Sequence, residues 1–342
     1  IQVYISEAVQ REGLKYFTYG VTGQDKDGKF EVYRRYSDFY HFRQLLVSLW
    51  PGCFIPPLPS KKVIGNKETR FLEDRRKFLQ YFMVKLSNLP YLWYSEEIKQ
   101  FIRNNNNQDF EKIITNMPKQ SNDDIINKYK TTFSYLSGKE INGELNMKIL
   151  TFKNFLKVAV SNLKKMKCFC RQLSLSKEKF DQQFNLVSTK ILPEYEMQSI
   201  LEYAQKNENY LIFNNNQILS NNLIEIQDQS KQNEFEIITD MIRMELKEVE
   251  AFLEILQQKE DLEEKKNKSQ IKVKSEQAEQ SKLQAGKTTF KSLFSTGSKE
   301  DKVQKLEKSI EETQHELDNY SLLVDLVTII IGYILQCFKY SF

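Results

Sequence analysis

The chain has 342 residues, enough for two or three domains, and its 50 basic and 46 acidic residues leave a net charge of +4. This near balance argues against a nucleic-acid partner, so any basic surface that matters must be local. The four cysteines follow no disulfide spacing, which predicts a reducing compartment. The two histidines cannot assemble a metal site of the usual spacing, and we expect no metal and no cofactor.

Three strands are predicted at the start of the chain. Aromatic and β-branched residues alternate with polar ones within residues 1–9, 14–23 and 29–35, as in half-buried strands. Residues 25–28, Asp-Lys-Asp-Gly, give a turn signal between the second strand and the third. The pattern predicts an antiparallel meander.

Helices follow the third strand. After Ser37 the apolar residues fall at helical spacing as far as Trp50. Three prolines within residues 56–59 then predict an extended, polyproline-like segment. A second helix is predicted over residues 67–87, and a short third helix around Phe101.

Arg75 falls on the apolar stripe of the second predicted helix, one turn after Phe71. A guanidinium on an apolar face needs an anion, because an unpaired buried charge is very costly. The anion could be Glu73 or Asp74, although neighbouring residues on a helix point in other directions. It could equally belong to a ligand.

Arg34, Arg35 and Tyr36 join the third strand to the first helix and place two guanidiniums beside an aromatic ring. Lys61 follows the proline segment, so with Arg75 three elements could direct cations and one ring at a single anion. We interpret that anion as a phosphoinositide headgroup, because Arg and Lys are the residues that bind phosphate. Alternatively, the arginines are ordinary strand-end charges and the prolines a ligand for an aromatic groove.

Four motifs in order resemble a phox homology (PX) domain of the sorting-nexin kind over residues 1–103: the strands, Arg-Arg-Tyr-Ser-Asp-Phe, Pro-Pro-Leu-Pro-Ser-Lys and Phe-Leu-Glu-Asp-Arg-Arg-Lys. The resemblance implies an α+β fold with a three-stranded antiparallel sheet plus helices. It implies that Arg35 holds the 3-phosphate of phosphatidylinositol 3-phosphate and that Tyr36 packs on the inositol ring. It further implies that Lys61 meets the 1-phosphate and that Arg75 holds the 4- and 5-hydroxyls.

A short loop precedes the second predicted helix. Its apolar residues Val63 and Ile64 are flanked by Lys62 and Lys67. Apolar tips among cations suit shallow insertion into an anionic membrane interface, so we predict a membrane-insertion loop here. The loop is shorter than in many PX domains.

Residues 104–145 are polar and read as a linker with weak helical patches. One patch contains Ile125, Tyr129 and Leu136 at helical spacing. Such a segment could be an amphipathic helix lying on the bilayer, or it could dock against the first domain.

From residue 146 onward the apolar residues follow heptad seams. Steps of three and four recur through residues 149–191, 235–256 and 303–338, which predicts three long helices in an antiparallel coiled coil. Pro193 is expected to kink the first of these helices, because it removes one backbone donor and clashes with the preceding turn.

One face of the first long helix is basic. Its cations fall on adjacent heptad positions, and these are Lys153, Lys157, Lys164, Lys167 and Arg171. Such a stripe could be a solvated face, or it could face a bilayer, where each cation near an anionic surface contributes about 1 kcal/mol.

Residues 146–342 resemble the BAR domain of sorting nexins, and the chain is most similar to the endosomal-recycling and autophagy-linked members. The resemblance implies an all-α, three-helix antiparallel coiled coil that forms a two-fold homodimer or heterodimer with a curved basic face. The third predicted helix is shorter than its partners.

Together these features predict a peripheral membrane scaffold and no enzyme, since neither a kinase motif set nor a nucleophile elbow is present. We expect a cytoplasmic protein that binds phosphatidylinositol 3-phosphate on endosomes and senses or induces curvature in vesicle and tubule sorting and protein transport. The alternative is a coiled-coil tether or tail-anchored protein with a degenerate lipid site. Residues 322–338 are nearly all apolar, but Asp325 interrupts them and a span needs about 20 residues.

Overall fold

The computed structural model describes residues 1–10, 16–59, 69–104, 110, 112, 117, 120–195, 233–285 and 299–338. The structure divides into two compact units, one of Ile1–Lys157 with Lys247–Phe342 and one of Val158–Leu246. The predicted domain boundaries, 1–103, 104–145 and 146–342, stay a prediction.

The sheet has three antiparallel strands in the order β1 (Gln2–Gln10), β2 (Phe17–Asp25) and β3 (Gly28–Arg35), as the alternating pattern predicted. In the β2–β3 turn a carboxylate oxygen of Asp25 accepts a hydrogen bond from the Asp27 backbone at 2.9 Å. Gly28 has φ +104°, a left-handed conformation that favours glycine, so the turn signal in the sequence has a direct physical cause.

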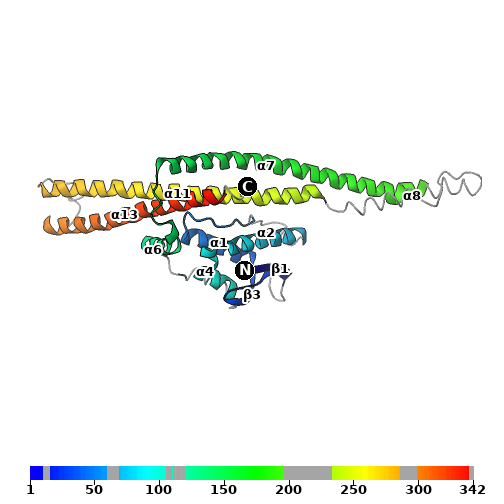
Figure 1. The fold of residues 1–342 in the computed structure, drawn as a ribbon, viewed down its shortest axis with the longest axis horizontal. Coiled ribbons are helices and arrows are strands. Elements are labelled where there is room, and N and C mark those ends of the chain that lie inside the picture. Colours follow the sequence, from blue (N-terminus) through cyan, green and yellow to red (C-terminus); the bar gives the residue numbers. More distant parts are fainter. Residues whose placement is uncertain are drawn as a thin grey trace, which may run out of the picture. The chain divides into compact units, whose positions relative to one another are not determined.

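Four helices pack with the sheet: α1 (Tyr36–Leu49), α2 (Thr69–Ser87), α3 (Pro90–Trp93) and α4 (Glu96–Arg103). Figure 1 shows the strands in dark blue with α1 and α2 beside them. The core between these helices is aromatic, because the rings of Phe42 and Phe101 stack at 4.1 Å and neither side chain is exposed. The sequence did not predict α3, whose four residues begin at a proline that suits a first helical position.

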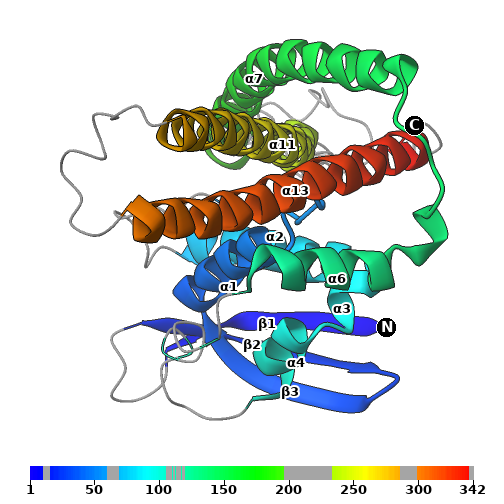
Figure 2. The ribbon, with the colours of Figure 1, turned by 90° about the vertical axis from the view of Figure 1, so that its left-hand side faces the viewer.

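The segment between the two predicted domains contains α6 (Asn122–Thr132) and the short 3-10 helix η1 (Ser134–Leu136). Ser121 and Asp124 form a reciprocal capping box that starts α6. The Tyr129 hydroxyl donates to the Pro51 carbonyl at 2.6 Å, and the Tyr129 ring is fully buried. Of the two alternatives, the structure shows docking for α6, which lies with α1 between the sheet and α13 in Figure 2.

The long helices are α7 (Gly143–Leu186), α11 (Glu234–Gln284) and α13 (Lys299–Phe338). Within the described residues the third has 40 residues against 44 in α7 and 51 in α11, so its described part is the shortest, in line with the prediction. A π-helical turn, η2 (Val187–Ile191), precedes Pro193 in α8 (Leu192–Glu194), which is how the helix accommodates the proline. The expected continuation past Asn221 lies outside the described residues.

The apolar end of α13 packs against the rest of its unit. By length and composition Val303–Gln336 would pass as a membrane span, and within the part of the chain that the structure describes it is the one helix that does. Leu323, Val327 and Ile331 are at most 3% exposed, so packing in the protein core accounts for part of this apolarity, with 39% of the apolar window buried. Val327 lies where a Cβ on Gly52 would fall, 2.4 Å away, which explains a glycine at that turn.

Candidate functional site

The two arginines at the end of β3 have different surroundings. Arg34 is 5% exposed and donates to the backbone carbonyls of Tyr33, Phe101 and Asn104 at 3.2, 3.1 and 2.7 Å. Phe101 and Asn104 lie at the end of α4, where helix carbonyls lack partners and cations are favoured. Arg34 is therefore a structural tie between β3 and α4.

Arg35 lies at the start of α1, where Asp38 holds it twice. One Asp38 oxygen accepts from the Arg35 backbone at 2.9 Å, and the other accepts from Arg35 Nε at 3.0 Å. Arg35 Cζ also lies 5.3 Å from the centroid of the Tyr16 ring. Burial raises the pKa of Asp38, although the hydrogen bonds and charge of Arg35 oppose the shift. These contacts fix the direction of the guanidinium at the N-terminus of α1.

Tyr36 follows Arg35 and is 7% exposed. Its hydroxyl donates to the carbonyl of Pro59, so the end of the proline segment is joined to α1. The guanidinium of Arg75 lies over the Tyr36 ring, with Cζ 4.1 Å from its centroid. Burial raises the pKa of Tyr36, so the hydroxyl keeps its proton.

Arg75 on α2 is the buried cation that the sequence singled out. It is 9% exposed, and its guanidinium also lies 4.3 Å from the centroid of the Phe71 ring. Glu73 pairs with Arg76 at 2.7 Å, and none of the ion pairs among the described residues involves Arg75. Arg75 Nε is buried without a hydrogen-bond partner within those residues. Burial lowers the pKa of Arg75, opposed by nearby Tyr19.

The position of α2 relative to the sheet is set by side chains that bond to the edge of β1. Gln80 accepts from the Ile5 backbone at 2.7 Å and donates to the Val3 carbonyl at 2.8 Å. Arg76 donates to the Ile5 carbonyl at 3.3 Å. The helix thus satisfies backbone groups of an edge strand and holds Arg75 over Tyr36.

Of the four predicted headgroup residues, Arg75 and Tyr36 are in contact, and Arg35 precedes Tyr36 in the chain. The fourth, Lys61, and the predicted insertion residues Val63 and Ile64 lie outside the described residues. The sequence had not assigned Asp38 or Tyr16 to the site. Asp38 had a usable signal, because a carboxylate three residues after a strand end is typical of a helix start, whereas nothing marked Tyr16.

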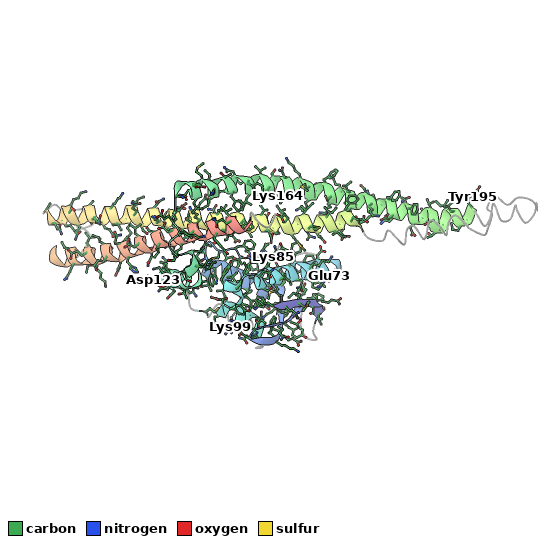
Figure 3. The ribbon with its side chains drawn as sticks, viewed as in Figure 1. Glu73, Lys85, Lys99, Asp123, Lys164 and Tyr195 are labelled. Carbon is green, nitrogen blue, oxygen red and sulfur yellow. The ribbon has the colours of Figure 1, made fainter. Side chains whose placement is uncertain are left out.

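The predicted basic face lies on α7. Lys157, Lys164 and Arg171 are exposed, and Figure 3 labels Lys164 there. Lys167 is half-buried. Lys153 is also half-buried and forms an ion pair with Glu260 of α11, so part of its charge is already compensated.

The same helix exposes large apolar side chains. They are Phe155, Val158, Met166, Phe169 and Phe180, each more than half exposed. At 100° per residue, their mean direction is roughly 180° from that of the basic residues. One helix therefore carries an apolar face and a basic face on opposite sides.

The PX domain family matches residues 23–105, so this part of the chain is a PX domain. Vacuolar protein sorting-associated protein vps5 of Schizosaccharomyces pombe is 34% identical over 108 residues, 30% of this chain and 19% of that protein. Sorting nexin-4 of Saccharomyces cerevisiae is 30% identical over 114 residues, 32% of this chain and 27% of that protein. The matches thus span about a fifth to a quarter of these relatives.

The fold of the whole chain is similar to a structure described as the cryo-EM structure of the SNX-BAR Mvp1 tetramer. The TM-score is 0.55 at 17% identity, and the match covers 99% of this chain and 92% of that one. Residues 23–105 thus match the PX family, the relatives that share this region are sorting proteins, and the fold of the whole chain is that of a protein with PX and BAR domains. The predicted fold class, an α+β PX domain followed by an all-α BAR domain, is confirmed.

Proposed function

We propose that the protein is a peripheral membrane scaffold that binds phosphatidylinositol 3-phosphate on endosomes and acts in membrane sorting. The observation that carries this proposal is Arg75, a buried guanidinium whose Nε has no partner among the described residues. The Arg75 guanidinium lies over the ring of Tyr36, the residue that follows Arg35 in the chain. The rings of Tyr36 and Phe71 and the nearby Tyr19 compensate the Arg75 charge only in part, because none of the described carboxylates pairs with it, so a ligand that supplies oxygen acceptors there accounts for its presence.

Arg35 and Arg75 suit the roles that the PX resemblance implies, whereas Tyr36 is largely buried and its ring lies under the Arg75 guanidinium. A guanidinium is a planar fork of donors that matches a phosphate with two bonds, which suits Arg35 to the 3-phosphate. Arg75, over the Tyr36 ring, offers hydrogen-bond donors that suit the 4- and 5-hydroxyls of the inositol. The Tyr36 ring supports Arg75 on one face, so we expect the inositol to contact the ring edge and the guanidinium together.

Co-sedimentation of the full chain with liposomes tests the headgroup assignment. We expect binding to liposomes with phosphatidylinositol 3-phosphate to exceed binding to those with the 4- or 5-phosphate isomer, and Arg35→Ala to remove the preference. Arg76→Ala is the matched control, because Arg76 is an α2 arginine already paired with Glu73. Equal binding of wild type and Arg35→Ala to all anionic liposomes would refute the assignment.

We further propose that two copies, or this chain and a related one, pair through the apolar face of α7. Large apolar patches on a monomer mark interaction sites, and Phe169 and Phe180 are 61% and 65% exposed. Pairing leaves the basic face on the opposite side of the helix for an anionic, curved bilayer. Two linked PX domains then bind far better than one, because the second event is intramolecular.

Analytical ultracentrifugation tests the pairing. We expect a dimer at micromolar concentration and a shift to monomer in Phe169→Glu, since a carboxylate would be buried in the contact. Lys164→Glu, on the basic face, should remain dimeric. A wild-type monomer at that concentration would refute self-pairing, and co-expression with a related sorting nexin would then test the heterodimer.

The tail-anchor alternative rests on the apolarity of residues 322–338, most of which fall within the span-like helix Val303–Gln336. Alkaline carbonate washing of membranes separates the two cases. A peripheral scaffold is released into the supernatant, and an anchored protein stays in the pellet.

A further inference from the structure

The proline segment of the PX domain is held by one side chain of α1. Arg43 Nε donates to the Pro56 carbonyl at 2.8 Å, and a terminal nitrogen of Arg43 lies 3.4 Å from the Ile55 carbonyl. Only 11% of the Arg43 side chain is exposed. A cation on two successive carbonyls fixes both the position and the direction of the chain there.

The terminal nitrogen of Arg43 that lies near the Ile55 carbonyl also reaches a long helix. Arg43 pairs with Glu254 of α11 at 2.5 Å. A cleft of 530 Å³ borders this pair, between α1, the prolines and α11, and the Glu254 side chain is 38% exposed. Arg43 therefore joins the proline segment to the helical region as well as to its own helix.

Neighbouring contacts bring the same face of α11 to the PX domain. The Gly52 backbone donates to Gln258 at 2.7 Å, and the Phe54 and Phe252 rings stack at 4.7 Å. Together with Arg43 and Glu254, these contacts fix both the start and the middle of the segment that leads from Gly52 to Pro59.

The segment is stiff enough to carry a displacement to its other end. Proline fixes φ, and proline-rich chain stays extended over several residues. Pro56 is held by Arg43, and three residues later the Pro59 carbonyl accepts from the Tyr36 hydroxyl. The ring of Tyr36 in turn supports the Arg75 guanidinium.

We propose that Arg43 and Glu254 are positioning residues for the phosphoinositide site. The ion pair with α11 fixes the position of the proline segment. The segment fixes the position of the Tyr36 hydroxyl, and the Tyr36 ring fixes the position of the Arg75 guanidinium. The helical region thereby tunes headgroup affinity within one chain, which is separate from any gain through dimerisation. This inference rests on the proposed function of the site.

The experiment titrates soluble inositol 1,3-bisphosphate into the full chain by isothermal calorimetry. A soluble headgroup removes membrane charge and avidity from the measurement. We expect Glu254→Gln to weaken binding about threefold and Arg43→Gln about tenfold, in the range of couplings between contacting residues. Glu248→Gln is the matched control, because it breaks the neighbouring ion pair with Lys85 but touches no part of the proline segment.

A second readout separates positioning from general destabilisation. In a Tyr36→Phe background the hydroxyl bond to Pro59 is absent, so we expect Glu254→Gln to lose most of its effect. The proposal would be overturned if Tyr36→Phe and Glu254→Gln weakened headgroup affinity independently, so that their factors multiply. An equal loss of affinity in Glu248→Gln would overturn it as well. If wild type and Arg35→Ala bind the headgroup equally, the proposed function itself fails. That outcome is distinct from a failure of the proposed coupling from Glu254 through Arg43 and Tyr36 to Arg75.

Discussion

The PX site and the basic face of α7 use the same kinds of cation in opposite surroundings. Arg75 is buried, stacked on two rings and has a buried Nε without a partner among the described residues. Lys157 and Lys164 are exposed on a helix surface. A buried guanidinium discriminates between ligands, because any group that fails to match it leaves a costly charge unpaired. Exposed cations attract any anionic surface and are weakened by salt.

The largest effect that sharpens this comparison is expected from the basic face. Replacing Lys157, Lys164 and Arg171 with glutamine should weaken binding to anionic vesicles by about 3 kcal/mol at low salt, at about 1 kcal/mol for each cation. Affinity for the soluble headgroup should not change. Vesicle flotation at two salt concentrations measures the first quantity and calorimetry the second.

A charge-matched control tests whether the loss of vesicle binding is specific to the basic face of α7. It removes three exposed lysines elsewhere, Lys99, Lys130 and Lys139. If this control loses as much vesicle binding as the α7 variant, net charge rather than the basic face attracts the membrane.

The next effect concerns the two arginines at the end of β3. Arg34→Met should lower the free energy of unfolding by about 2 kcal/mol, because three backbone carbonyls lose a charged donor. Arg35→Met, at the more exposed site, should change stability by less than about 1 kcal/mol. Urea unfolding followed by circular dichroism measures both, and equal losses would contradict the separation of roles.

A smaller effect with the opposite sign is expected at Arg75. Arg75→Met should leave stability unchanged or raise it by about 1 kcal/mol, since an apolar side chain replaces a buried cation. Headgroup affinity should fall about tenfold, because hydrogen bonds to charged groups are lost. A destabilisation as large as that of Arg34→Met would indicate that Arg75 has a structural role instead.

The smallest effect is chemical and leaves binding unchanged. Cys53 lies at the start of the proline segment, and burial raises the pKa of its thiol to about 12. Only the thiolate reacts, so the raised pKa and the burial both protect Cys53 at pH 8. Iodoacetamide should modify exposed Cys168 well before Cys53, as mass spectrometry would show. Equal rates would mean that the segment opens readily from its core.

Much of the PX domain could be predicted from the sequence because its signals are local. The alternating strands, the Asp-Lys-Asp-Gly turn and the helical stripe carrying Arg75 each follow from residue types at fixed spacing. The roles of Arg34 and Arg35 could not be separated in that way. Adjacent residues on a strand point to opposite faces, but only the folded chain shows which face meets the end of α4.

The ion pair between Arg43 and Glu254 could not be predicted from the sequence either. The two residues are 211 positions apart, and neither lies in a motif. The docking of α6 was left open for a related reason, since an amphipathic helix looks the same whether its apolar face meets a protein or a bilayer. Burial of Ile125, Ile126 and Tyr129 decides that case, and only the structure provides it.

The central claim is that the PX site selects its ligand by fit and not by charge alone. Calorimetric titration of the full chain with inositol 1,3-bisphosphate and inositol 1,4-bisphosphate, at equal charge, tests it most directly. We predict at least about a tenfold preference for the 1,3 isomer, as expected when a buried hydrogen bond is lost. We also expect Arg35→Ala to abolish that preference and the α7 triple variant to retain it. Equal affinity of the wild type for the two isomers would contradict the claim.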